Sequence, residues 1–189
     1  MVDKWKMKKW YTLVAPPLFD NKEIFEVVAA DDKILINRII RANLLDLISV
    51  SSQAAMLTSL NFRIHEVKGA QAFLKLIGHE VSPTYIKTFA RRGKSLIHVV
   101  CDIHTKDGEQ VRIKSVGVTS GKISNTTATN LRLSLKEEVI KNCDGLTYDE
   151  LMQEILYGKL VSKIFNKLKQ IASMRRVEIR KTERKETFK

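Results

Sequence analysis

Residues Leu96–Val118, LIHVVCDIHTKDGEQVRIKSVGV, decide the fold that this sequence predicts. Apolar and polar residues largely alternate on both sides of Lys106–Glu109, and a period of two indicates strands with one buried face. Gly108 can adopt a positive φ in the connecting turn. Gly117 interrupts the second run and is interpreted as a β-bulge. The hairpin therefore has an apolar side and a basic side, and we expect further strands to join it, because a lone hairpin is marginally stable.

Composition and charge limit the possible classes of protein. A chain of 189 residues, 44% of them hydrophobic, can bury one core, so one compact domain with extensions is the simplest expectation and two small domains are the alternative. A formal net charge of +12 indicates a polyanionic partner, nucleic acid first and an anionic membrane surface second. Eleven Lys and Arg against three Glu between positions 159 and 189 concentrate much of this excess near the C-terminus.

Targeting and redox signals are few. The only cysteines, Cys101 and Cys143, cannot build a disulfide framework or a four-cysteine zinc site, which favours a reduced intracellular setting. The opening MVDKWKMKKWY has no apolar run behind its charges and is not expected to be a signal peptide. No stretch reaches the roughly 18 apolar residues of a membrane span.

Catalytic and metal-binding patterns were sought without success. The sequence has none of the glycine-rich nucleotide-binding motifs and no GxSxG nucleophile motif. His98 and His104 share one face of the expected strand, but no third metal ligand is evident. Asp102 lies in the same row, where a solvated or RNA-facing role is expected in preference to catalysis. We therefore predict no catalytic residue, no metal and no cofactor.

The first half of the chain combines clear and ambiguous patterns. Residues 10–14, 61–67 and 72–81 are each expected to form a strand. Periodicity alone cannot decide between strand and helix for residues 23–30 or for residues 34–50.

Helical patterns are more frequent in the second half. A short helix is expected after Ser82, a good N-cap, with Pro83 in its first turn. The capping-box pattern at Thr147 predicts the start of another helix. Before that helix we expect a loop at 119–130 and a helix at 131–143. After it we expect a helix at 160–171, a strand at 175–180, and a tail at 181–189 that is disordered in the isolated protein.

Clusters of cations are the candidate RNA-binding sites. In the N-terminal arm, lysines alternate with tryptophans, which suits phosphates and unpaired bases, although Trp10 is expected to pack onto the domain. The RRGK stretch at residues 91–94 can be interpreted equally well as the cationic C-terminus of a helix or as a phosphate contact. The row of lysines that starts at Lys159 can also be interpreted as the solvated face of a helix. The candidates are Lys4, Trp5, Lys6, Lys8, Lys9, Arg91, Arg92, Lys94, Lys122, Lys159, Lys163, Lys167, Arg175, Arg176, Arg180, Lys181, Arg184 and Lys185.

Several short stretches together resemble one protein family. The opening Lys9–Tyr11 with Ala15-Pro16 and Phe19 resembles that of archaeal and eukaryotic small-subunit ribosomal proteins of the S-three-A-e type, called e-S-one in the unified nomenclature. The likeness continues at Thr105–Gly108 and ends with Val177–Lys181. The length is similar to that of archaeal members. Two departures are Asn37-Arg38 in place of a glycine-arginine pair, and a less basic loop at 122–132.

The resemblance implies an α+β fold with a β-barrel-like antiparallel domain, a short internal helix, C-terminal helices and basic terminal extensions. It favours strand for residues 34–50. We accordingly expect a basic arm at 1–9, the β-barrel-like domain at 10–125, helices packed on it at 126–172, and a basic tail at 173–189.

The resemblance also implies a structural, non-enzymatic role in translation. It places the chain on the ribosome in the cytoplasm, at the small-subunit platform near the messenger RNA exit. The expected partners are ribosomal RNA, neighbouring ribosomal proteins and messenger RNA at the exit, without a membrane and without a homo-oligomer. The alternative is a free-standing RNA-binding or translation-associated factor, or a nuclease.

Overall fold

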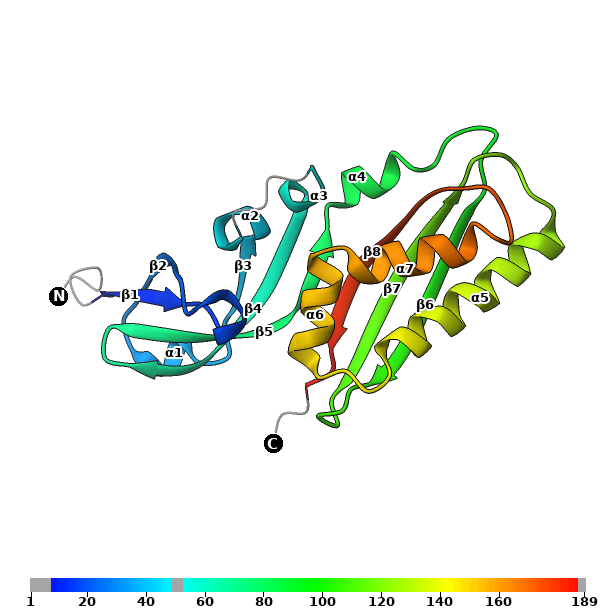
Figure 1. Ribbon diagram of the computed structural model, residues 1–189. Helices are drawn as coiled ribbons and strands as arrows, with labels where there is room; N and C mark the ends of the chain where they lie inside the picture. The colour runs from blue at the N-terminus through cyan, green and yellow to red at the C-terminus, as the bar shows by residue number, and fades with distance from the viewer. Residues whose placement is uncertain (1–7, 49–52, 187–189) are drawn as a thin grey trace. The chain divides into compact units, whose positions relative to one another are not determined.

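The structure is a computed structural model that describes residues 8–48 and 53–186 (Figure 1). Backbone contacts divide the chain into two compact units, residues 1–79 and residues 80–189. Each unit is described by itself below.

The first unit consists mainly of strands. Strand β1 (Lys9–Val14) pairs antiparallel with β2 (Glu23–Ala29) and parallel with the beginning of β5 (Gln71–Val81). Strand β3 (Ile39–Asn43) pairs antiparallel with β4 (Thr58–Lys68), and β4 pairs with β5. Three single-turn helices and one 3-10 turn connect the strands: α1 (Asp32–Leu35), α2 (Leu44–Leu47), α3 (Gln53–Met56) and η1 (Pro17–Phe19).

The ambiguous segments of this unit are now assigned. Residues 23–30 form strand β2 over most of their length. The expectation that residues 34–50 are mainly strand is wrong for the described part, since β3 covers five residues and lies between α1 and α2. Asn37 interrupts the segment with φ of 68°. Asparagine tolerates this left-handed region better than most residues, so Asn37 provides a conformation that a glycine would also adopt.

The prediction that Trp10 packs onto the domain is wrong, because its side chain is 65% exposed. Its neighbour Tyr11 takes the inward position and is 2% exposed. The Tyr11 hydroxyl donates a hydrogen bond to Asp32 Oδ1 at 2.5 Å. Successive side chains of a strand point to opposite faces, so burial of Tyr11 directs Trp10 outwards.

The second unit is built on the predicted hairpin. Strand β6 (Leu96–His104) pairs antiparallel with β7 (Gln110–Thr119) in unbroken register, which confirms the hairpin. Strand β8 (Met174–Arg184) pairs antiparallel with the other side of β7. Helices α5 (Asn125–Cys143), α6 (Tyr148–Leu156) and α7 (Lys159–Leu168) lie over one face of these strands (Figure 1).

Both faces of the three-stranded sheet carry buried apolar residues. On the face covered by the long helices, Ile97 and Ile113 of the hairpin are fully buried, as are Leu135 of α5 and Leu160 of α7. Short helix α4 (Pro83–Lys87) and the turn after it contribute to a separate cluster with the hairpin. That cluster contains Val81, Ile86, Phe89, Val116 and Val118.

The bounds of α5 and β8 differ from the sequence-based expectation. Helix α5 begins at Asn125 instead of Leu131, because the Ser124 side chain caps it by accepting a hydrogen bond from the Thr127 N–H at 3.2 Å. The predicted loop is correspondingly shorter. Strand β8 continues to Arg184 and includes residues that were expected to be disordered, and Thr182 is 1% exposed.

The bulge predicted at Gly117 is absent from the described β6–β7 ladder. The register shifts lie in the β7–β8 ladder, between Lys114 and Ser115 and between Val118 and Thr119. Gly117 instead permits close packing, because a Cβ atom there would lie 3.0 Å from Met174 Cε.

Hydrogen bonding orders the strands β2-β1-β5-β8-β7-β6, with β3 and β4 attached through β5. Within the described residues this eight-stranded sheet does not close, so the barrel implied by the resemblance is not found. The coarser expectation of a mixed α and β fold is confirmed. In the part of the chain that is described, no helix combines the length and apolarity needed to cross a membrane.

The capping box of α6 provides the first testable prediction. The Thr147 side chain accepts from the Glu150 N–H, and Glu150 Oε2 accepts from the Thr147 N–H at 2.9 Å. We expect Thr147→Ala to lower the free energy of unfolding by about 1 kcal/mol, measured by urea denaturation.

These hydrogen bonds also lower the pKa of Glu150 below its ordinary value of 4.5. The contribution of Glu150 is therefore present above pH 4.5 and is lost as the pH falls through the folded-state pKa. A Thr147→Ser variant, which keeps the acceptor, should retain wild-type stability.

Candidate nucleic-acid interface

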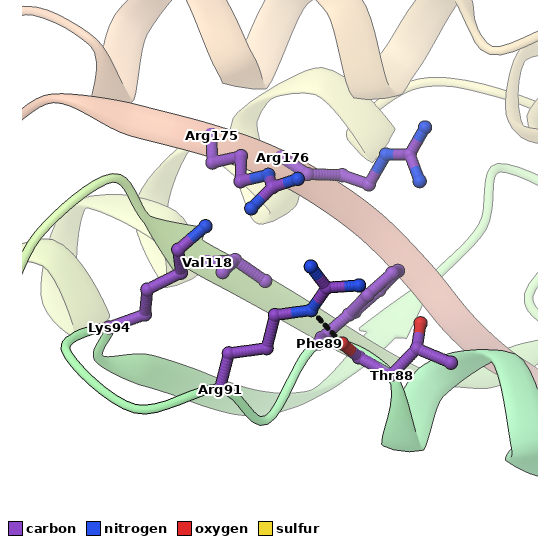
Figure 2. Close-up of a pocket in the computed structure, with 7 residues that line it drawn as sticks. All are labelled: Thr88, Phe89, Arg91, Lys94, Val118, Arg175 and Arg176. Atoms are coloured by element: carbon purple, nitrogen blue, oxygen red, sulfur yellow. Dashed lines mark hydrogen bonds between the residues drawn. The ribbon is translucent and has the colours of Figure 1, made fainter.

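Four cationic side chains surround one pocket of about 250 Å³ in the second unit (Figure 2). Arg91 and Lys94 come from the turn after α4, and Arg175 and Arg176 come from the start of β8. The lining is completed by Thr88, Phe89 and Val118. In Figure 2 the charged ends of Lys94, Arg91 and Arg175 face the same space above Val118. The structure thus brings together two cation clusters that are about 80 residues apart in the sequence.

The turn after α4 holds its cations by local hydrogen bonds. Arg91 Nε donates to the Thr88 carbonyl at 3.3 Å, at the C-terminal end of the helix. Gly93 has φ of 75°, which lets the chain reverse before Lys94. The helix-terminus and phosphate interpretations of RRGK are therefore compatible, because one nitrogen of Arg91 caps the helix while the guanidinium lines the pocket.

An irregularity in the sheet places Arg175 and Arg176 at the same pocket. Consecutive residues of a regular strand point to opposite faces. Here Val118 pairs with Arg176 while Thr119 pairs with Met174, so Arg175 is the extra residue of a bulge. A bulge redirects a side chain locally. This feature was missed by the sequence-based analysis, because nothing in the letters RR distinguishes a bulged strand from a regular one.

Arg176 is held in place by its surroundings. Its guanidinium carbon lies 5.6 Å from the ring centroid of Tyr85 and 5.8 Å from that of Phe89. It also donates a hydrogen bond to the Tyr85 hydroxyl, and its Nε lies 3.6 Å from Glu178 Oε1. Burial raises the pKa of Glu178, and the charge of Arg176 acts in the opposite direction. These contacts fix the position of one pocket cation before any ligand binds.

The pocket has the electrostatics of an anion site. Burial lowers the pKa of Lys94 below its ordinary 10.5, and the charges of Arg175 and Arg91 lower it further. The lowered pKa reports that these cations repel one another. A phosphate placed among them would remove the repulsion and accept hydrogen bonds from guanidinium and ammonium groups.

The remaining predicted RNA-binding residues are dispersed. Arg92 follows Arg91 in the same turn and is exposed. Exposed positions on other elements hold Lys122, Lys159, Lys167 and Arg180. Lys163 contacts Glu154 at 3.0 Å and so is partly neutralised. In the first unit Lys8 and Lys9 are exposed at the start of β1, whereas Lys4, Trp5 and Lys6 lie outside the described residues.

Three predicted RNA-binding cations at the end of β8 form ion pairs. Lys181 lies 2.7 Å from Glu183, and Lys185 lies 3.4 Å from Asp102. Arg184 forms an ion pair with Glu109 and is only 11% exposed. Each of these cations pairs with a carboxylate of the chain, as Arg176 of the pocket does with Glu178.

The basic side of the hairpin is partly neutralised by the same carboxylates. Arg112 donates two hydrogen bonds to Asp102, at 2.7 and 2.8 Å, and Lys114 contacts Glu183 at 2.9 Å. The Arg112 guanidinium holds the pKa of Asp102 well below its ordinary value, assisted by Lys185. Asp102 is therefore an ion-pair partner of Arg112 and Lys185. In the described part of the chain, no group of three His, Cys, Asp or Glu residues is suited to binding a metal ion.

Fold and site together define a basic α+β protein with a cationic pocket beside a mainly antiparallel sheet. The chain belongs to the Ribosomal S3Ae family, whose profile matches residues 1–187. This confirms the resemblance seen in the sequence, and the family is one of ribosomal proteins, not of enzymes.

Similar named proteins come from archaea. The chain is 36% identical to "Small ribosomal subunit protein eS1" of Saccharolobus islandicus strain L.S.2.15 over 180 residues, which is 95% of this chain and 86% of that protein. It is 35% identical to the protein of the same name from Saccharolobus solfataricus, with the same coverage. It is 34% identical to the one from Sulfurisphaera tokodaii, covering 95% of this chain and 92% of that protein.

Proposed function

We propose that this chain is a structural constituent of the small ribosomal subunit that binds ribosomal RNA through the four-cation pocket formed by Arg91, Lys94, Arg175 and Arg176. Family membership supports the ribosomal role. The observation that carries the RNA contact is the convergence of these cations on one concave space. Nucleic-acid backbones supply the phosphates that such a site neutralises.

The pocket supports backbone recognition more than base recognition. Its charged groups match phosphate oxygens, and its apolar residues Phe89 and Val118 are both less than a tenth exposed. Contacts of this kind position a protein on folded RNA without reading sequence, and they weaken as salt rises. The exposed Lys122, Lys159, Lys167 and Arg180 would add long-range attraction.

The family resemblance supports further features of the proposed ribosomal role. They are a place on the platform near the messenger RNA exit, contacts with neighbouring ribosomal proteins, and contact with messenger RNA there. A ribosomal protein of this kind works in the cytoplasm.

Co-sedimentation tests the ribosomal role. A tagged full-length chain expressed in its own cells should travel with small subunits in a sucrose gradient at close to one copy per particle. Ribonuclease treatment should release it, because RNA holds it in the particle. A free-standing factor would remain at the top of the gradient or appear at well under one copy per subunit, and that result would contradict the proposal.

A further inference from the structure

A second concave surface, of about 320 Å³, lies beside β8 and shares Arg175 and Arg176 with the cationic pocket. One wall is a single face of α7, formed by Val161, Ser162, Phe165 and Asn166, and the other is residues 175–178 of β8. We refer to these residues as the β8 groove. The α7 wall carries no cation, although the same helix has three lysines at Lys159, Lys163 and Lys167. The α7 side of the groove therefore offers no positive charge to a nucleic-acid backbone, and the cations of the groove lining are Arg175 and Arg176.

The strand wall of the groove is an open edge. Strand β7 pairs with one side of β8. On the other side, within the described residues of this unit, the ladder partner is Glu80 opposite Lys181. In an antiparallel strand, alternate residues direct their N–H and C=O away from the partner strand. Residues 175–178 thus present backbone donors and acceptors that a further strand can pair with.

The side chains around this edge favour an acidic and partly apolar segment. Val161 and Phe165 are half-buried and offer apolar contact, while Ser162 and Asn166 are exposed and polar. Arg175 and Arg176 bring two positive charges, against which Glu178 brings one negative charge that already contacts Arg176. An added strand places alternate side chains against such a wall.

We propose that the β8 groove binds an extended acidic segment of a neighbouring protein, which adds to the edge of β8 as a further strand. That the neighbour is a component of the small subunit rests on the proposed function. The cationic pocket and the groove share Arg175 and Arg176, so RNA and protein partners would meet at this end of β8.

Site-specific photo-crosslinking in assembled particles tests the inference. Asn166, in the groove, and Gln170, an exposed amide one helical turn further on, would each be replaced by benzoylphenylalanine in tagged full-length chains. Irradiated small subunits should give a protein adduct from position 166, mapped by mass spectrometry to an acidic segment, and not the same adduct from position 170. An adduct with RNA, an adduct with a basic segment, or no adduct in particles that contain the variant would overturn the groove assignment. If the tagged unmodified chain were itself absent from small subunits, the proposed function would fail, and this inference with it.

A second measurement tests strand addition directly. A synthetic peptide copying the crosslinked segment should slow amide hydrogen exchange at residues 175–178 of the purified full-length chain by tenfold or more. Asn166→Asp, which adds one negative charge inside the groove, should weaken this binding three- to tenfold. The matched Gln170→Glu variant adds the same charge outside the groove and should change it less than twofold. Equal effects of the two variants, or protection that avoids 175–178, would overturn the proposal.

Discussion

Replacing Arg184 by alanine is expected to lower the free energy of unfolding by about 2–3 kcal/mol. The Arg184 side chain is 11% exposed, its guanidinium pairs with Glu109, and its guanidinium carbon lies 4.8 Å from the centre of the Tyr148 ring. Removing one member of a buried pair leaves the other charge without compensation, which typically costs about 3–5 kcal/mol. We expect a loss at or just below the lower end of this range, because the Glu109 side chain is 27% exposed and can be partly hydrated.

The matched control is Arg180→Ala on the same strand. Arg180 is exposed, and both arginines were predicted from the sequence to bind RNA. Arg180→Ala should change the stability by about 0.5 kcal/mol or less. Urea denaturation followed by circular dichroism measures both variants. Equal stability of the two would show that Arg184 is not structural, contrary to the ion pair seen here.

Arg184 also illustrates what sequence patterns can and cannot indicate. The hairpin, the strand at the start of the chain and the α6 capping box were predictable, because each depends on residues close together in the sequence. The partner of Arg184 was not, because Glu109 lies 75 positions earlier in the chain and meets it only through the pairing of β7 with β8. The density of charge in the sequence therefore predicted a basic tail. In the fold, several of these cations form ion pairs with carboxylates of the same unit.

The same limit applies to the candidate site. All four pocket cations were predicted from the sequence to bind RNA, but as two separate clusters. Their convergence depends on a bulge opposite Val118 and on the turn at Gly93. For residues 34–50 the family resemblance gave a wrong prediction. It favoured a strand, whereas Asn37 and two single-turn helices divide the segment.

Removing two charges from the cationic pocket is expected to weaken RNA binding by about 10- to 100-fold in 0.1 M salt, at roughly 0.7–1.4 kcal/mol for each of the two lost phosphate contacts. The variant is Arg91→Gln with Lys94→Gln, which spares the β8 groove, because neither residue lines it. Each lost phosphate contact should also reduce the slope of log affinity against log salt concentration by about 1. Filter binding of small-subunit RNA fragments at several salt concentrations measures both quantities.

The fold should tolerate this change. Within the described residues neither Arg91 nor Lys94 takes part in an ion pair, and burial first, then the charges of Arg175 and Arg91, lower the pKa of Lys94. Thermal denaturation should therefore show an unchanged or slightly higher melting temperature. The matched control, Lys122→Gln with Arg180→Gln, also removes one lysine and one arginine, from exposed positions outside the pocket lining. It should weaken RNA binding by threefold or less, since dispersed charges contribute only screened attraction. If both double variants lost affinity equally, the RNA would be held by net charge and the pocket would have no special role.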